Sequence, residues 1–178
     1  REMLTMIEGL QSINRSILNR LRPMALGQVP VVELLSALVG ERAGQHPELP
    51  IAFSSAGLLP SYGESIDLTL YRCVQEGLTN IARHAKAKRA SVTITHRNDL
   101  ACTEDNAAQL TLTIADDGRG IDTHVQKGIG MQGMQERVQA LGGECRFEAT
   151  AGKGTLLRIH IPVPAAISAQ STPGSSRA

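Results

Sequence analysis

Aromatic side chains are scarce in this chain of 178 residues, which has two Phe, two Tyr and no Trp. Proteins that bind single-stranded nucleic acid stack bases on aromatic side chains, so the scarcity argues against that function. Cysteine is also rare, with only Cys73, Cys102 and Cys145. An odd number of widely spaced Cys indicates neither a disulfide framework nor a zinc site, and it favours reduced thiols.

Neither sign of charge dominates, because 18 Lys and Arg balance 17 Asp and Glu to a net charge of +1. Such a balance gives no bulk attraction to nucleic acid or to an anionic membrane. No apolar run approaches the ~20 residues of a membrane span, and no signal peptide is evident. We therefore expect a cytoplasmic domain, connected to an inner membrane only through segments upstream of Arg1.

Periodicity and composition divide the chain into four parts. Residues 1–22 carry apolar side chains at heptad spacing, which fits pairing with another helix and an ordinary core helix equally well. Residues 23–29 form a linker and residues 30–162 a folded domain. Residues 163–178 are rich in Ala, Ser and Pro, a composition typical of a disordered tail.

Within the folded domain, two periodicities indicate helices and strands in alternation. Helical spacing predicts helices over 31–43, 65–86 and 130–141. Alternating or apolar runs predict strands over 50–54, 90–96, 110–114, 144–149 and 155–161. The last two strands flank a glycine turn and form a hairpin, so the sheet is at least partly antiparallel. These elements predict an α+β fold, a two-layer α/β sandwich with a mixed sheet and helices on one face.

Three polar residues follow one another at four-residue spacing in the longest predicted helix, namely Glu76, Asn80 and His84. On an α-helix this spacing places them in one polar stripe. A carboxylate one turn from an amide oxygen suits hydrated Mg²⁺, which takes few protein oxygens and completes its shell with water and phosphate. A solvated helix face explains the same pattern without a ligand.

A second motif, Asp116-Asp117-Gly118-Arg119-Gly120, directly follows a predicted strand. Its two glycines allow a tight turn and a close approach to a flat ligand. An aspartate at the strand end can accept a hydrogen bond from an exocyclic amine such as that of adenine. An ordinary acidic turn is the alternative, since Asp-Gly is common in turns.

Residues 128–133 fit the pattern Gly-x-Gly-x-x-Gly, with Gly128, Gly130 and Gly133 as its glycines. A dinucleotide-binding fold needs this pattern directly after a strand and within a βαβ unit, and neither is indicated here. A glycine-rich lid that leads into a helix N-terminus, with Lys127 beside it, is the preferred interpretation because such an end offers free N–H groups to phosphate. The fourth motif, Gly152-Lys153-Gly154-Thr155, predicts only a tight turn when taken alone.

The order of the four motifs resembles the N, G1, G2 and final glycine boxes of the Bergerat (GHKL) ATP-binding fold. Histidine kinases, Hsp90-type chaperones, MutL-type repair proteins and type II topoisomerases share this fold, and the resemblance covers about residues 30–162. Three segments are also similar to sensor kinases of the UhpB/NarX/DesK group. These segments are Leu21-Arg22-Pro23, Asn80-Ile81-Ala82-Arg83-His84-Ala85 and Gly130-Met131-Gln132-Gly133-Met134-Gln135-Glu136-Arg137-Val138.

This resemblance implies ATP and Mg²⁺ as cofactors and gives roles to individual residues. Asn80 is implied as the Mg²⁺ ligand, and Glu76 as the acid that orients or activates the attacking group. Asp116 is implied to bind the adenine amino group in a pocket shaped by glycines and supported by Thr155. The remaining implied site residues are Gly118 and Gly120 in the adenine pocket, Gly128, Gly130 and Gly133 in the lid, and His84 and Lys127 near the phosphates.

The resemblance also implies a function and partners. The chain would be the ATP-binding catalytic domain of a sensor histidine kinase that is a homodimer at full length. It would transfer the γ-phosphoryl group of ATP to a histidine upstream of Arg1 and then to the receiver domain of a response regulator. Residues 1–22 would end the second dimerisation helix, and they contain no His, so the chain alone is not expected to autophosphorylate.

Three alternatives remain open from the sequence: an ATP-driven clamp of the chaperone or repair type, a scaffold that has lost nucleotide binding, and a nucleic-acid binder. The last rests on a basic cluster between residues 83 and 97. The acidic stretch over 99–122 offsets this cluster and aromatics are lacking, so we expect no nucleic-acid partner.

Overall fold

The computed structural model describes residues 28–97, 108–120, 129–150, 153–164 and 167. The helices are α2 (Val31–Gln45), α3 (Glu64–Asn80), the π-helix η1 (Ile81–Ala85) and α4 (Ile129–Gln139). The strands are β1 (Ile51–Ala56), β2 (Ala90–Arg97), β3 (Gln109–Asp116), β4 (Glu144–Thr150) and β5 (Gly154–Pro162). Among these residues, no helix combines the length and the apolar character that crossing a bilayer requires.

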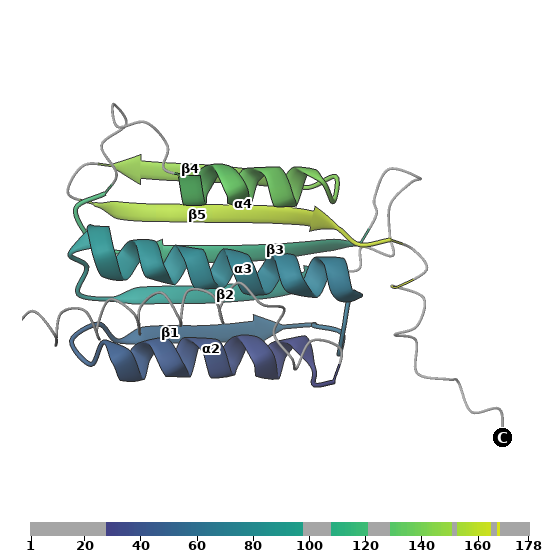
Figure 1. The fold of residues 1–178 in the computed structure, drawn as a ribbon, viewed down its shortest axis with the longest axis horizontal. Coiled ribbons are helices and arrows are strands. Elements are labelled where there is room, and N and C mark those ends of the chain that lie inside the picture. Colours follow the sequence, from purple (N-terminus) through teal and green to yellow (C-terminus); the bar gives the residue numbers. More distant parts are fainter. Residues whose placement is uncertain (1–27, 98–107, 121–128, 151–152, 165–166, 168–178) are drawn as a thin grey trace, which may run out of the picture.

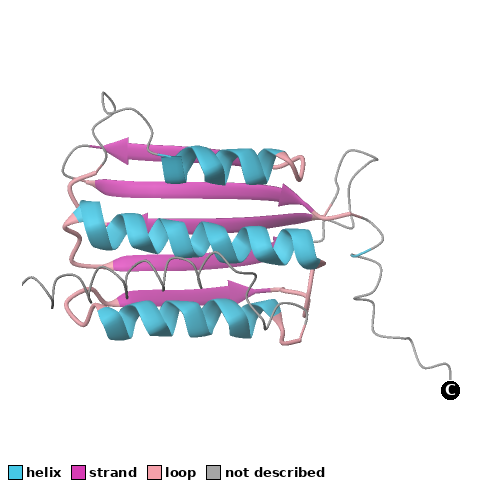
Figure 2. Ribbon diagram, viewed as in Figure 1, coloured by secondary structure: helices cyan, strands magenta, loops and turns pink. Residues whose placement is uncertain are grey.

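The five strands form one mixed sheet in the order β1-β2-β3-β5-β4. β1 and β2 are parallel because α3 carries the chain back between them, and the other neighbouring pairs are antiparallel. Figures 1 and 2 show α2, α3 and α4 side by side against the same face of the sheet. The predicted α+β sandwich with helices on one face is therefore confirmed.

The core lies between the three helices and the inner face of the sheet. Alternate residues of the central strands are buried there, as the period of a half-covered strand requires. The predicted apolar face of α3 is buried in full: Ile66, Leu70, Cys73, Val74, Leu78 and Ile81 are at most 6% exposed. Burying one Leu or Ile side chain contributes roughly 1.5–3 kcal/mol, so this face holds α3 firmly on the sheet.

Most element boundaries differ by a residue or two from the sequence expectations, and three of the differences have a clear physical reason. α2 continues to Gln45, because its glycines at 40 and 44 lie on open helix surface and do not end it. β1 runs from 51 to 56 because each of its residues pairs with β2. The helix expected over 65–86 is α-helical only to Asn80 and continues as a π-helix to Ala85, and Lys86 then takes the left-handed φ of 51°.

α4 ends at Gln139, two residues before the expected end at 141, and the expected glycines follow it. Gly142 has a φ of +71°, and the Gly143 N–H donates to the Val138 carbonyl at 3.0 Å. This is the usual way in which a glycine just past a helix satisfies the last carbonyls. β3 and β4, before and after α4, run parallel but are separated by the antiparallel β5, so no adjacent pair of parallel strands flanks the Gly-x-Gly-x-x-Gly motif. This mixed sheet is not that of a dinucleotide-binding fold.

A buried carboxylate organises the end of the sheet that is opposite Asp116. Asp67, near the start of α3, is 3% exposed and accepts hydrogen bonds from Ser61 Oγ at 2.5 Å and from the Tyr62 N–H at 3.0 Å. The Tyr62 ring meets His96 edge-on, with ring centroids 5.3 Å apart. Burial raises the pKa of Asp67 above its ordinary value of 3.8, although the two hydrogen bonds act in the opposite direction. The carboxylate thus fixes the loop between β1 and α3.

Replacing Asp67 with Ala is expected to lower the free energy of unfolding by about 1–3 kcal/mol, because the buried Tyr62 N–H loses its acceptor. Asp67→Asn keeps an acceptor oxygen and cannot titrate. Because the pKa of Asp67 is raised in the folded state, the protonated carboxyl group stabilises the fold. This contribution to the free energy of unfolding is fully present below pH 3.8 and is lost as the pH rises through the folded-state pKa. Wild type should therefore lose stability relative to Asp67→Asn over that rise in urea titrations. A pH-independent difference would contradict the burial argument.

Candidate functional site

The candidate site is built around the carboxyl end of β3, where Asp116 is the last strand residue. Asp116 lies opposite Ala90 of β2 on one side and opposite Thr155 of β5 on the other. The Asp-x-Gly-x-Gly motif and the final Gly-x-Gly-Thr motif are therefore neighbours in space although they are far apart in the sequence. Thr155 lies directly beside Asp116, as its expected supporting role requires.

The Asp116 carboxylate is half-buried and partly occupied by its own turn. Its Oδ1 atom accepts a hydrogen bond from the Gly118 N–H at 2.8 Å. Within the part of the chain that the structure describes, Oδ2 has no hydrogen-bond partner and is available as an acceptor. A fixed carboxylate with one available oxygen suits an amino group such as that of adenine.

Two glycines allow the backbone segments around Asp116 to approach closely. Gly118 is buried, and a Cβ there would overlap the Ala85 carbonyl oxygen at the end of η1. Gly154 has a φ of +88°, and a Cβ there would overlap the Asp116 carbonyl and lie 3.0 Å from the Asp117 Cα. Gly120 has a φ of +76°, which also favours glycine. The sequence expectation named Gly118 and Gly120 but missed Gly154, since a tight turn explained it.

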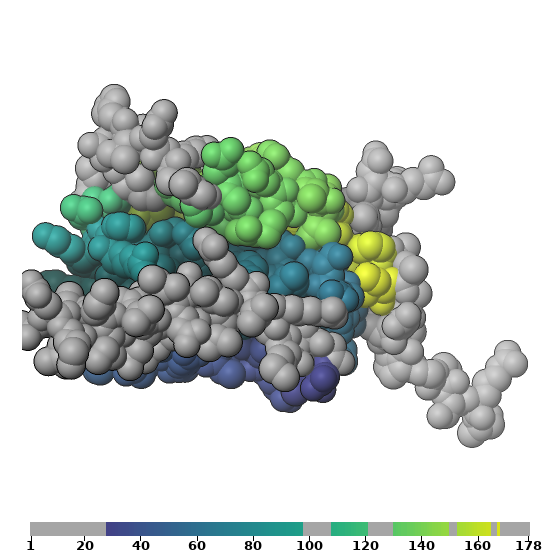
Figure 3. All heavy atoms as spheres, in the orientation of Figure 1, coloured from purple at the N-terminus to yellow at the C-terminus, as the bar shows by residue number. Residues whose placement is uncertain are grey.

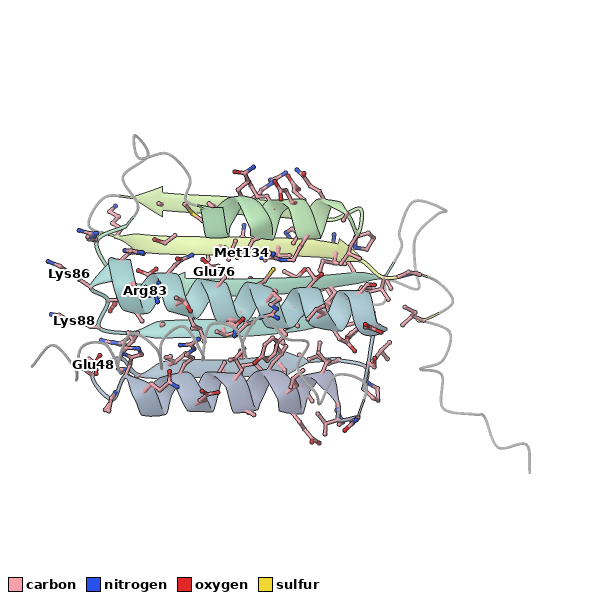
Figure 4. All side chains as sticks on the ribbon, in the orientation of Figure 1. Glu48, Glu76, Arg83, Lys86, Lys88 and Met134 are labelled. Carbon is pink, nitrogen blue, oxygen red and sulfur yellow. The ribbon has the colours of Figure 1, made fainter. Side chains whose placement is uncertain are left out.

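Glu76 and Gly130 lie where α3 and α4 approach each other. A Cβ at Gly130 would overlap the Glu76 carboxylate, so this glycine leaves room for the acid over the first turn of α4. Figure 4 shows Glu76 on the side of α3 that faces α4, and Figure 3 shows the surfaces of the two helices in contact. Asn80 follows one helical turn later, at the end of α3. The expected pairing of acid and amide along one side of the helix is present.

His84 lies one further turn along the chain, in the π-helix η1. The turn is wider there than in an α-helix. The His84 side chain is exposed, while its backbone carbonyl accepts a hydrogen bond from Arg119 Nε at 2.7 Å. The expectation of one stripe of three residues stays a prediction at its third member.

The lid residues receive uneven support from the structure. Gly130 is required sterically, as described above. Gly133 lies inside α4, and a Cβ there would be 3.3 Å from the mobile end of the Arg137 side chain, so nothing in the structure requires glycine. Lys127 and Gly128 lie outside the described residues.

Three further residues near the candidate site were given no role from the sequence. Asp117 and Arg119 bind the connection between η1 and β2, as detailed below. Gly77 lets α3 approach the sheet, because a Cβ there would be 2.7 Å from Ile114 Cδ1. A signal for Gly77 existed, since it lies four residues after Cys73 on the apolar face. No comparable signal marked the other two, because their partners are backbone atoms.

A metal ion at this site would need ligands beyond the residues that the structure describes. Within the described ranges, no group of three or more His, Cys, Asp or Glu side chains is arranged to hold a metal. The nearby oxygens of Glu76 and Asn80 fit a hydrated Mg²⁺ that takes its other ligands from phosphate and water.

Gly154→Ala should lower the free energy of unfolding more than Gly63→Ala does. Both glycines have positive φ values, +88° and +87°, so both variants acquire backbone strain of about 1–3 kcal/mol. At Gly63 a Cβ meets nothing within 4 Å, whereas at Gly154 it meets the Asp116 carbonyl within the sheet. Urea unfolding of the two variants measures the difference. Equal losses would show that the close approach to Asp116 is unimportant.

Comparison with known proteins gives a consistent family. Residues 66–165, more than half of the chain, match the family described as "Histidine kinase-, DNA gyrase B-, and HSP90-like ATPase". The signal transduction histidine-protein kinase/phosphatase DegS of Brevibacillus brevis is 30% identical over 165 residues, which cover 92% of this chain and 40% of that protein. The sensor histidine kinase YxjM of Bacillus subtilis is 31% identical, with 88% and 37% covered.

Solved structures agree on the fold. The histidine kinase domain of the blue-light activated kinase EL346 of Erythrobacter litoralis matches with a TM-score of 0.61 at 22% identity. The match covers 78% of this chain and 64% of that one. This chain spans about 40% of the length of the first curated relatives. The chain therefore belongs to the family of histidine kinase-, DNA gyrase B- and HSP90-like ATPases, and the curated relatives named above are histidine kinases.

Proposed function

We propose that this chain is the ATP-binding catalytic domain of a sensor histidine kinase that transfers the γ-phosphoryl group of Mg·ATP to a histidine. The observation that carries the proposal is the meeting of the motifs at one end of the sheet. Asp116 lies beside Thr155 in the sheet. Gly118 closely approaches the Ala85 carbonyl, and Gly154 closely approaches the Asp116 carbonyl. The Glu76 carboxylate lies against Gly130. We propose that this adenine acceptor and the acid–amide helix form one site.

The adenine end of the proposed site is the turn after β3. Asp116 would accept a hydrogen bond from the adenine amino group through its available oxygen. Gly118, whose N–H donates to Asp116, and Gly120, with its positive φ, shape the turn after it, and Thr155 lies next to it in the sheet. The sheet holds Asp116 on both sides, so the acceptor is fixed before the ligand arrives.

The phosphate end of the proposed site is the seam between α3 and α4. Asn80 would hold Mg²⁺, with Glu76 nearby, and the ion would neutralise phosphate charge. The first turn of α4 adds backbone N–H groups that no helical carbonyl uses, and these favour an anion. His84, Lys127 and the lid glycines Gly128, Gly130 and Gly133 are proposed to be close to the phosphates.

The proposed reaction joins a histidine nitrogen to the γ-phosphorus as the bond to the β–γ bridging oxygen breaks, so that ADP leaves. Such a transfer depends mainly on positioning and charge neutralisation, which these residues supply. Glu76 would orient the attacking imidazole or accept its proton. The position of its carboxylate over Gly130 supports this role, because the acid lies where the lid helix begins.

The partners and domain limits are proposals drawn from the relatives and the sequence. The acceptor histidine would lie upstream of residues 1–22, which would end a dimerisation helix and pair in a homodimer. Residues 23–29 would link it to the catalytic domain at 30–162, and 163–178 would form a tail. The phosphoryl group would pass to a response regulator, and any connection to a membrane would run through upstream segments.

Asp116→Ala should weaken binding of a non-hydrolysable ATP analogue. A hydrogen bond to a charged acceptor contributes roughly 1.5–3 kcal/mol, which corresponds to about a 10- to 150-fold rise in Kd. Calorimetric titration in the presence of Mg²⁺ measures the change. Asp67→Asn is the control, because it alters a carboxylate at the opposite end of the sheet. Unchanged affinity in Asp116→Ala would sink the adenine assignment.

Asn80→Ala should reduce the dependence of nucleotide binding on Mg²⁺, since the variant loses the amide oxygen proposed to hold the ion. Affinity for the ATP analogue is titrated at increasing Mg²⁺ for the variant and for wild type. The gain that Mg²⁺ gives to wild type should be smaller in the variant, with binding in EDTA little changed. Identical Mg²⁺ curves for the two proteins would refute the assignment of Asn80.

A further inference from the structure

The turn after β3 is hydrogen-bonded to the connection between η1, which continues α3, and β2. The Asp117 Oδ1 atom accepts two backbone hydrogen bonds, from the Lys88 N–H at 2.7 Å and from the Arg89 N–H at 2.9 Å. The Asp117 N–H in turn donates to the Arg89 carbonyl at 3.3 Å. One aspartate therefore holds both polar groups of the backbone just before β2.

Arg119 holds the other end of the same connection. Its N–H donates to the Ala85 carbonyl at 2.8 Å, and its Nε donates to the His84 carbonyl at 2.7 Å. These carbonyls lie at the end of η1, where no following helical N–H is available to them. Gly118, between the two polar residues, is packed under Ala85. We call Asp117 and Arg119 with these four partners the 117–119 clasp.

The clasp joins the two ends of the proposed nucleotide site. Asp117 is next to Asp116, and the segment that the clasp grips, residues 84–89, follows Asn80 through the single turn of η1. We infer that Asp117 and Arg119 are positioning residues that fix the adenine acceptor Asp116 relative to the metal ligand Asn80. This inference rests on the proposed function.

The clasp acts only on a ligand that reaches both ends of the site. Mg·ATP would contact Asp116 and Asn80 together, so its affinity depends on their separation being set in advance. Adenosine would reach Asp116 alone, and Asp116 is also held by its sheet pairs Ala90 and Thr155. Hydrogen bonds from the Arg89 and Lys88 N–H groups lower the pKa of Asp117, so the carboxylate remains charged at neutral pH.

The test compares Mg·ATP-analogue and adenosine affinities in wild type, Asp117→Ala, Asp117→Asn and Arg119→Gln by NMR titration. In Asp117→Ala the Kd for the Mg·ATP analogue should rise roughly 3- to 10-fold, while that for adenosine changes less than about twofold. Asp117→Asn keeps an oxygen for the two N–H groups and should recover part of the loss. Arg119→Gln keeps the backbone bond to Ala85, so it should lose less.

Hydrogen exchange and two controls separate the possible results. Exchange of the Lys88 and Arg89 amides should accelerate in Asp117→Ala, and the fingerprint spectrum reports whether each variant is folded. Asp67→Asn should leave the ratio of the two affinities unchanged, because it perturbs only the opposite end of the sheet.

The outcomes separate this inference from the proposed function. If wild type binds both ligands, Asp116→Ala weakens both and the clasp variants keep the wild-type ratio, the inference is wrong and the nucleotide site stands. If wild type binds neither ligand, the proposed function and the inference both fall. An equal loss of adenosine and Mg·ATP affinity in the clasp variants would also overturn the inference, because it would place Asp117 in the adenine pocket.

Discussion

Around the carboxyl end of β3, backbone packs directly against backbone. Gly118 lies under the Ala85 carbonyl and Gly154 lies against the Asp116 carbonyl, at separations that leave no room for a side chain. The candidate site depends on these two contacts, because they bring three separate segments to one carboxylate. The sheet pairs of Asp116 with Ala90 and Thr155 complete the arrangement. A fixed acceptor of this kind loses little freedom when a ligand binds.

The π-helix η1 links this packing to the phosphate end of the site. An α-helix continued past Asn80 would keep its carbonyls within i to i+4 hydrogen bonds. The wider turn instead presents the His84 and Ala85 carbonyls to Arg119. The helix is therefore π-helical where its carbonyls bind Arg119 of the second motif. Short π-helical turns are frequent at functional sites.

The two ends of the sheet use aspartate in similar ways in different surroundings. Asp67 and Asp117 both accept backbone N–H groups and hold a loop in place. Burial dominates at Asp67 and raises its pKa, whereas hydrogen bonds dominate at the exposed Asp117 and lower its pKa. Asp67 fixes the loop before α3, far from Asp116, which makes it a matched control for the functional end.

The sequence by itself determined the elements, the mixed sandwich and the motifs, because helical and strand periodicity and glycine spacing are local properties. Residues such as Glu76, Asn80 and Asp116 could be named for this reason. Only the tertiary structure decided that α3 changes to a π-helix after Asn80, that Gly154 is required against Asp116, and that Asp117 and Arg119 grip the segment before β2. These features depend on contacts between backbone atoms distant in the sequence, and no side-chain pattern records which carbonyl or N–H group a folded chain brings into reach.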